Sequence, residues 1–172
     1  IITSVKTIIN DNSKLTCRIP GLENYSPARI ILDKRLKIPI NSNVTKSAKE
    51  NKTLIFFNTG ENKKIEFLKS LKVKLYKFPL SKDGNFDLES ILIKIKLFGY
   101  SRILLDSGLT MTTNFLRSNL VDDFYLFISN NNLGSFGNNN MKKIVKMYLS
   151  KKNYTNEVVN LMGDKLISYK IK

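Results

Sequence analysis

The sequence predicts a single α/β domain with a mixed, mainly parallel central sheet that ends in an antiparallel hairpin. Between residues 28 and 128, short apolar runs typical of buried strands alternate with amphipathic helical stretches, which is the period of a parallel sheet. Near the end, Gly163-Asp164 separates two strand-like segments, a two-residue connection that favours a hairpin. At 172 residues and 42% hydrophobic, the chain is long enough for one domain with a substantial core.

The first third of the chain supplies three expected strands. Residues 1–9 are predicted to form an apolar strand, residues 28–32 a compact buried strand, and residues 53–57 a second buried strand. The stretch 34–52 between them is polar and is predicted to be irregular. These strands therefore form the first part of the sheet.

Two helices and a further strand follow. A helix is predicted soon after Gly60, then a strand at 73–79 in which apolar residues alternate with lysines, then a helix at 88–98 that Gly99 ends. The apolar positions at helical spacing are Ile65, Leu68 and Leu71 in the first helix, and Leu88, Ile91, Leu92, Ile95 and Phe98 in the second.

The stretch 101–119 is the junction most suggestive of a binding site. A buried strand at 103–105 is predicted to pass through the small-residue turn Asp106-Ser107-Gly108 into a helix that starts near Thr110. Such a junction presents unpaired backbone N–H groups and the positive end of the helix dipole to an anion, and a glycine allows close approach. An ordinary strand-to-helix connection with Thr110 as its N-cap is the alternative, and spacing alone leaves both open.

The last third is expected to complete the sheet. Residues 124–128 are apolar on both faces and are predicted to form a central strand. The Asn/Gly-rich tract 130–140 is expected to be a surface loop or a flap over a site. The segments 154–162 and 165–171 form the predicted hairpin.

The net charge of +15 raises nucleic acid or an anionic membrane as partners, but the basic residues do not support either. They are mostly lysines spread over every segment, and no aromatic-interleaved basic motif of a nucleic-acid module occurs. We therefore expect a solvated surface, no nucleic-acid partner and no membrane partner. The arginines are at positions 18, 29, 35, 102 and 117.

Cysteine and histidine usage excludes several chemistries. Cys17 is the single cysteine and the chain has no histidine, so an internal disulfide is excluded and we expect no metal site. No run has the length of a membrane span and no leader is visible, which predicts a cytoplasmic protein. Because the chain begins with the strand-like residues from Ile1 rather than with Met, we expect that a segment upstream is absent.

The polar turn after residue 9 offers a second candidate site. Asp11 lies in a turn-forming cluster, and Lys14 and Arg18 place two cations in one short loop. Arginine presents a fork that matches a phosphate group. The alternative is an Asx-turn flanked by two solvated cations.

Several segments in order resemble the reductase domain of the bacterial riboflavin-biosynthesis bifunctional deaminase-reductase, whose fold is dihydrofolate-reductase-like, a three-layer αβα arrangement. The family's G-T-V-L-A-D-D-P-x-L-T-x-R run resembles Lys6–Arg18, and its S-P-x-R-V-V-L-D run resembles Ser26–Asp33. Its V-E-G-G-x-T and G-L-V-D segments are similar to Leu105–Thr110 and Asn119–Asp122, and its L-G-x-D hairpin to Leu161–Asp164 with Met162 inserted. The resemblance covers essentially the whole chain as a single domain, 1–172.

The resemblance implies an oxidoreductase that transfers hydride from NADPH to a phosphoribosylamino-pyrimidine and gives a ribitylamino product. Leu15 and Arg18 are then substrate-binding residues, Arg18 contacting the phosphate, and Asp106 faces the substrate as the catalytic residue. A homodimer is implied, because the terminal hairpin of this family often serves dimerisation. The family's first strand, a helix with a further substrate-binding arginine and a zinc deaminase half would lie upstream of Ile1. The implied NADPH-binding residues are Thr7, Asp11, Asn58, Gly108, Leu109, Thr110, Met111 and Thr112.

The sequence departs from the family at the site. Asp106 replaces a glutamate, Ser107 replaces the first glycine of a pair, and Asp11-Asn12-Ser13 replaces an acidic pair followed by proline. Asp106 retracts the carboxylate by about one methylene, and a displacement of ~1 Å can cost ~10²-fold in rate. The alternatives are another dihydrofolate-reductase-like NADPH oxidoreductase and, outside enzymes, a basic nucleic-acid-binding module.

Overall fold

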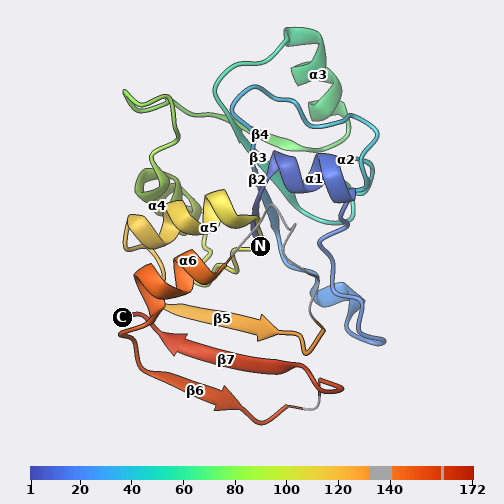
Figure 1. Ribbon diagram of the computed structural model, residues 1–172. Coiled ribbons are helices and arrows are strands. Elements are labelled where there is room, and N and C mark those ends of the chain that lie inside the picture. The colour runs from blue at the N-terminus through green and yellow to red at the C-terminus, as the bar shows by residue number, and fades with distance from the viewer. Residues whose placement is uncertain (132–140, 160) are drawn as a thin grey trace. The chain divides into compact units, whose positions relative to one another are not determined.

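The computed structural model describes residues 1–131, 141–159 and 161–172, which form two compact units, Ile1–Gly108 and Leu109–Lys172 (Figure 1). The first unit contains a parallel sheet in the order β1-β2-β3-β4. Its strands are β1 (Ile2–Ser4), β2 (Arg29–Leu32), β3 (Thr53–Phe57) and β4 (Lys74–Lys77). A single parallel bridge between Ile2 and Leu105 adds a short segment beside β1.

Helices cover both faces of this sheet and give the first unit three layers. On one face lie α1 (Val5–Asp11), α2 (Asn43–Lys46) and α3 (Asn62–Ser70). On the other face lies α4 (Leu88–Leu97), where the rings of Tyr76 and Phe98 are 4.7 Å apart. A 3-10 turn, η1 (Glu23–Tyr25), lies in the connection between α1 and β2.

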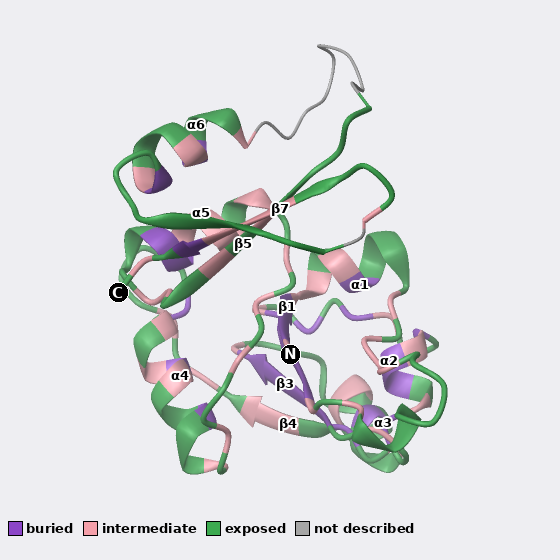
Figure 2. Ribbon diagram, turned by 90° about the horizontal axis from the view of Figure 1, so that it is seen from below, coloured by how far each residue is buried: buried purple, intermediate pink, exposed green. Residues whose placement is uncertain are grey.

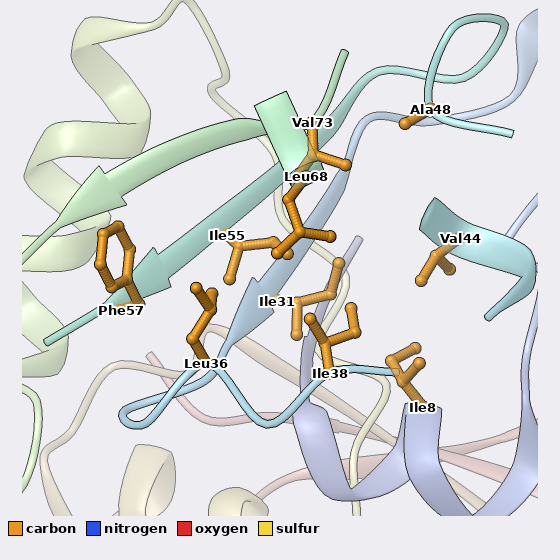
Figure 3. Packing of buried hydrophobic residues seen from close by; sticks show 10 residues of the cluster. All are labelled: Ile8, Ile31, Leu36, Ile38, Val44, Ala48, Ile55, Phe57, Leu68 and Val73. Atoms are coloured by element: carbon orange, nitrogen blue, oxygen red, sulfur yellow. The ribbon is translucent and has the colours of Figure 1, made fainter. Parts of the chain in front are cut away.

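The core of the first unit lies between the sheet and the α1, α2 and α3 layer (Figure 3). Every residue of β2 and β3 is buried, as a parallel sheet covered on both faces requires (Figure 2). Alternate residues of these strands point to opposite faces. The members of the cluster are Ile8, Ile31, Leu36, Ile38, Val44, Ala48, Ile55, Phe57, Leu68 and Val73.

The second unit contains helix α5 (Leu109–Arg117) and an antiparallel sheet in the order β5-β7-β6. The strands are β5 (Asp123–Ile128), β6 (Tyr154–Glu157) and β7 (Lys165–Lys170). Between β5 and β6 the chain forms α6 (Lys142–Ile144), which continues into the helical segment η2 (Val145–Leu149). Within the described residues, no helix combines the length and the hydropathy needed to cross a membrane.

The structure confirms the predicted fold class, with a parallel sheet, flanking helices and a terminal antiparallel hairpin, but the hairpin strands pair with β5 in a separate sheet and do not complete the parallel one. β3 has the predicted bounds, and the predicted strands at 28–32 and 73–79 correspond to β2 and β4. Helices α3 and α4 lie where the apolar spacing places them. Gly99 ends α4 with a φ of 89°, a backbone conformation that glycine adopts without strain.

Three predictions in the first unit are wrong. Residues 1–9 do not form one strand, because β1 ends at Ser4 and α1 follows. The stretch 34–52 is not merely irregular, since it contains α2 and four buried core residues. The segment 103–105 is not a buried strand, because it makes one bridge and Leu104 is 60% exposed.

Predictions in the second unit also need correction. β5 is an outer strand of the described sheet, and Phe127 is 65% exposed, so residues 124–128 are not a doubly covered central strand. β6 ends at Glu157, so the hairpin connection runs from 158 to 164 rather than over two residues. The helical segment 142–149 was not predicted. Most of the Asn/Gly-rich tract, 132–140, lies outside the described residues.

Candidate functional site

Hydrogen bonds around Asn58 join the segments that follow the carboxyl ends of β2, β3 and β4. The backbone N–H groups of Asn58 and Thr59 both donate to the Lys34 carbonyl at 3.0 Å. The Asn58 side-chain amide donates to the Phe78 carbonyl at 3.0 Å, just beyond β4. In open α/β sheets ligands bind at this edge, and Asn58 therefore lies where a cofactor can reach it.

Helix α1 places two predicted cofactor residues on one face. Thr7 and Asp11 are four residues apart, so their side chains are neighbours along the helix. Thr7 is half-buried, and its hydroxyl lies 3.4 Å from the Ser4 hydroxyl at the end of β1. Asp11 is exposed and is the last residue of α1, so it does not lie in the turn that the sequence predicted.

The loop from residue 12 to residue 18, here called the 12–18 loop, carries both predicted substrate residues. Leu15 has a φ of 53° and packs against the core of the first unit, whereas Arg18 is exposed. Asn12, at a φ of 45°, ends α1 and donates its N–H to the Ile8 carbonyl. The loop therefore packs on the core through Leu15 and carries two exposed cations, Lys14 and Arg18.

Arg29 is the residue that sequence reasoning missed. Arg29 lies within a segment that resembles the family and had no predicted role, yet it is 0% exposed in β2. Burial lowers the pKa of Arg29 to about 10, and the Glu50 carboxylate partly offsets this, so the guanidinium stays charged at neutral pH. It donates to the carbonyls of Lys14 (2.9 Å), Val44 (3.0 Å), Ser47 (3.3 Å) and Asn51 (2.9 Å) and to the hydroxyls of Ser47 (2.9 Å) and Thr53 (2.6 and 3.1 Å).

Asp33 closes the end of β2. Its buried carboxylate accepts the N–H groups of Lys37 and Ile38, both at 2.8 Å. A buried carboxylate needs such partners, and here they fold the chain into the tight turn that follows the strand. Because both oxygens are used in this way, Asp33 is a structural carboxylate.

A second loop at this edge, 81–85, is attached to the end of β2 through Lys34. Its ammonium group donates to the Gly84 carbonyl at 2.9 Å and to the Asn85 side-chain oxygen at 2.6 Å. Within the loop, hydrogen bonds from Ser81 and Asn85 lower the pKa of the Asp83 carboxyl to about 2. The Asp83 carboxyl therefore stays ionised at neutral pH.

Asp106 and Gly108 end the first unit. The Asp106 N–H donates to the Ile2 carbonyl at 3.0 Å, and the Ile2 N–H donates to the Leu104 carbonyl at 2.9 Å, so Asp106 lies beside β1 with its side chain exposed. A Cβ added at Gly108 would meet nothing within 4 Å. The backbone here is open to a ligand without any side chain in the way.

Helix α5 begins the second unit and carries the remaining predicted cofactor residues. It begins at Leu109, so Thr110 lies inside the first turn and is not the N-cap. No acidic residue lies in that turn, and Thr110 is exposed. The first N–H groups of a helix suit a phosphate group, so the first turn of α5 fits the pyrophosphate of a dinucleotide.

Most of the predicted residues of the first unit either follow β1 along the chain or lie beside it. β1 leads directly into α1 with Thr7 and Asp11, the 12–18 loop follows, and the segment that pairs with β1 through the single bridge at Leu105 continues to Asp106. A surface hollow of about 630 Å³ elsewhere in this unit contains none of the predicted site residues. Its lining residues are Pro39, Ile40, Asn41, Glu61, Lys63, Lys64 and Phe67.

Comparison with known proteins connects this architecture to one family. The family model described as the RibD C-terminal domain matches residues 1–159. The chain is 29% identical over 173 residues to the riboflavin biosynthesis protein RibD of Aquifex aeolicus, covering 99% of this chain and 46% of that protein. The chain thus spans less than half the length of this curated relative.

Solved structures share the fold. A diaminohydroxyphosphoribosylaminopyrimidine deaminase/5-amino-6-(5-phosphoribosylamino)uracil reductase from Thermotoga maritima matches with a TM-score of 0.69 at 20% identity, over 99% of this chain and 44% of that one. A pyrimidine reductase-like protein from Corynebacterium diphtheriae matches with a TM-score of 0.75 at 16% identity, over 99% of this chain and 75% of that one. At these sequence identities the structural likeness shows the fold alone.

Proposed function

The chain belongs to the RibD C-terminal domain family, and from this membership we propose that it is a reductase of riboflavin biosynthesis. The reaction is the NADPH-dependent conversion of 5-amino-6-(5-phosphoribosylamino)uracil to 5-amino-6-(5-phosphoribitylamino)uracil. The observation that carries the proposal is the family match over residues 1–159, which includes every residue assigned to the site. The match runs across both compact units, which supports treating residues 1–172 as one reductase domain.

The substrate side of the site is assigned to the 12–18 loop. Arg18 is exposed and carries the fork-shaped cation that suits a phosphate group, so we assign it to the substrate phosphate. Leu15 packs on the core and holds the loop against the first unit. The exposed Asp106 carboxylate is assigned to the ribosyl hydroxyls, where it orients the substrate.

The cofactor side is assigned to α1, to the end of β3 and to the start of α5. Thr7, Asp11 and Asn58 offer hydroxyl, carboxylate and amide groups to the nucleotide, and the first turn of α5 offers backbone N–H groups to its pyrophosphate. When bound, NADPH supplies the hydride. The protein's part is to hold and orient both ligands. The assigned residues of the last segment are Gly108, Leu109, Thr110, Met111 and Thr112.

Further features of the proposal follow from the same assignment. We propose a homodimer in the cytoplasm, with the phosphoribosylamino-pyrimidine as the natural ligand. Size-exclusion chromatography with light scattering tests the dimer, and a monomer at micromolar concentration contradicts it.

The first test measures NADPH oxidation with the phosphoribosylamino-pyrimidine in the full-length natural protein. Arg18→Lys keeps the charge but loses the fork, so KM for this substrate should rise at least fivefold while NADPH binding stays unchanged. The control is Arg117→Lys, at an exposed position in the last turn of α5. Turnover of dihydrofolate but not of the pyrimidine would instead indicate another oxidoreductase of this fold.

A second test addresses the cofactor assignment. Gly108→Val adds a branched side chain where the anion must approach, and since a Cβ there meets nothing, the fold should survive. We expect the dissociation constant for NADPH to rise at least tenfold with an unchanged melting temperature. Gly60→Ala is the contrasting control, because its Cβ would lie 2.8 Å from the Leu36 side chain and should lower stability instead. Unchanged NADPH affinity in folded Gly108→Val contradicts the assignment.

A third test separates the two roles open to Asp106. Asp106→Asn keeps the size of the side chain and removes its charge, so an orienting role predicts at least a tenfold loss in kcat and in kcat/KM at an unchanged melting temperature. Asp106→Glu restores the family's longer carboxylate and should keep or raise activity. Wild-type turnover in Asp106→Asn would make Asp106 a structural residue.

A further inference from the structure

The backbone of the 12–18 loop is strained and needs support. Leu15 has a φ of 53°, in the left-handed region that a bulky non-glycine residue rarely adopts, and Asn12 has a φ of 45°. Asparagine tolerates this region, but a leucine there is strained. The loop would therefore relax to another conformation unless contacts with the rest of the first unit hold it.

Arg29 holds the loop directly before the strained residue. One terminal nitrogen of its guanidinium donates to the Lys14 carbonyl at 2.9 Å, in the peptide unit that joins Lys14 to Leu15. The same nitrogen donates to the Ser47 hydroxyl at 2.9 Å, and the other terminal nitrogen donates to carbonyls between residues 44 and 51. Arg29 thus fastens the loop to the segment that leads into β3.

Asn43 holds the start of the loop through a reciprocal pair. Its backbone N–H donates to the Asn12 side-chain oxygen at 2.8 Å, and its side-chain amide donates to the Asn12 carbonyl at 2.7 Å. The side-chain oxygen and the carbonyl of Asn12 therefore both accept from Asn43, the first residue of α2. This pair fixes the point where the chain leaves α1.

Ser26 holds the end of the loop. Its hydroxyl accepts the Cys17 N–H at 3.1 Å and donates to the Glu23 carbonyl at 2.7 Å. Cys17 immediately precedes Arg18, so this hydrogen bond positions the backbone from which the exposed Arg18 side chain extends. The three contacts lie at residues 12, 14 and 17, on both sides of Leu15 and directly before Arg18.

We propose that Arg29, Asn43 and Ser26 are positioning residues that hold the 12–18 loop in its substrate-binding conformation before the substrate arrives. The inference rests on the proposed function, since it takes the loop as the substrate's phosphate site. A loop that is already ordered does not lose conformational freedom when the substrate binds. The contacts of the three residues should therefore raise substrate affinity rather than the rate of the chemical step. None of the three residues needs to touch the substrate.

The experiment uses Asn43→Ala and Ser26→Ala in the full-length natural protein, with Ser70→Ala as the matched control. Ser70 likewise donates one side-chain hydrogen bond to a backbone carbonyl, that of Phe67 at 2.7 Å, but it lies at the end of α3. We expect each loop variant to raise KM for the pyrimidine at least fivefold with kcat within twofold and NADPH affinity unchanged. Amide hydrogen exchange at residues 12–18 should accelerate at least tenfold in both, and not in Ser70→Ala.

Arg29→Lys adds a stronger variant. It keeps the charge but cannot reach the same set of acceptors, so it should combine the KM effect with faster exchange in the loop. Because Arg29 is buried, this variant could fail to fold, and the two milder variants then decide the question. Unchanged KM in folded Asn43→Ala and Ser26→Ala overturns the proposal, as does an equal effect in Ser70→Ala.

The proposed function and the proposed positioning of the loop can be tested separately. If the wild-type protein turns over no pyrimidine, the proposed function fails. Hydrogen exchange needs no substrate, so it still tests whether the three residues hold the loop in place. Unchanged exchange at residues 12–18 in the variants contradicts this role, and faster exchange supports it.

Discussion

The two sheets of the molecule differ in how completely they are buried. In the parallel sheet every residue of β2 and β3 is buried, whereas in the antiparallel sheet β6 is exposed throughout and β5 has only two half-buried residues (Figure 2). Parallel strands occur with both faces covered, while antiparallel sheets tolerate solvent on one face. We infer that the first unit supplies most of the stability and supports the loops assigned to the proposed substrate site.

The largest expected effect comes from a core truncation that the other sheet should tolerate. Ile55→Ala removes a side chain that is 0% exposed in β3 and should lower the free energy of unfolding by about 3–4 kcal/mol. Phe127→Ala removes a larger side chain from β5, but this side chain is 65% exposed. The substitution should therefore change the free energy of unfolding by about 0.5 kcal/mol or less. Chemical denaturation of both variants gives the measurement, and equal losses would contradict the comparison.

Native-state hydrogen exchange sharpens the comparison without a mutation. Amides of β3 should exchange only through global unfolding, whereas amides of the exposed strand β6 should exchange through local opening. We expect rates in β6 at least 100-fold faster. Similar protection in the two strands would mean that both units unfold together.

The smallest effect compares two aspartates. Asp33→Asn removes the charge and one acceptor from a buried carboxylate that holds two N–H groups, and should cost about 1–2 kcal/mol. Asp123→Asn breaks an exposed ion pair with Lys170, 2.8 Å long in the antiparallel sheet, and should cost about 0.5 kcal/mol or less. Thermal denaturation resolves the difference, and a larger loss in Asp123→Asn would reverse the assignment of stability to the first unit.

The same contrast explains which elements could be predicted from the sequence. β3 has five apolar or β-branched residues in a row, and because both faces of the strand are covered, the run itself marks the strand. Residues 1–9 look similar, yet the chain turns into α1 at Val5, which an apolar run of this length cannot reveal. In β5 the apolar residues suggested a covered strand, but apolar side chains are also common on exposed surface.

The irregular segments were the hardest to predict. Leu36 and Ile38 are buried and alternate with exposed Lys37, yet they form no strand, and Val44 is buried from the short helix α2. Their burial depends on packing against the rest of the first unit, which a short local pattern does not reveal.

The candidate site shows the same limit. The roles of Thr7 and Asp106 came from the resemblance to a family, whereas Arg18 in the polar turn and the junction near Gly108 were also singled out by physical reasoning as places for an anion. Their roles stay predictions. Arg29 escaped notice because an arginine inside an apolar strand carries no sign of its partners, which come from residues 14 and 44–53.

The burial of Arg29 also allows chemical labelling to report on unfolding of the first unit. Of the five arginines, Arg29 is buried, and the other four, at 18, 35, 102 and 117, are exposed. A dicarbonyl reagent that modifies guanidinium groups should therefore label the four exposed sites in the native protein and spare the fifth. Modification at position 29, detected by peptide mass spectrometry, would then report the moment at which the parallel sheet opens.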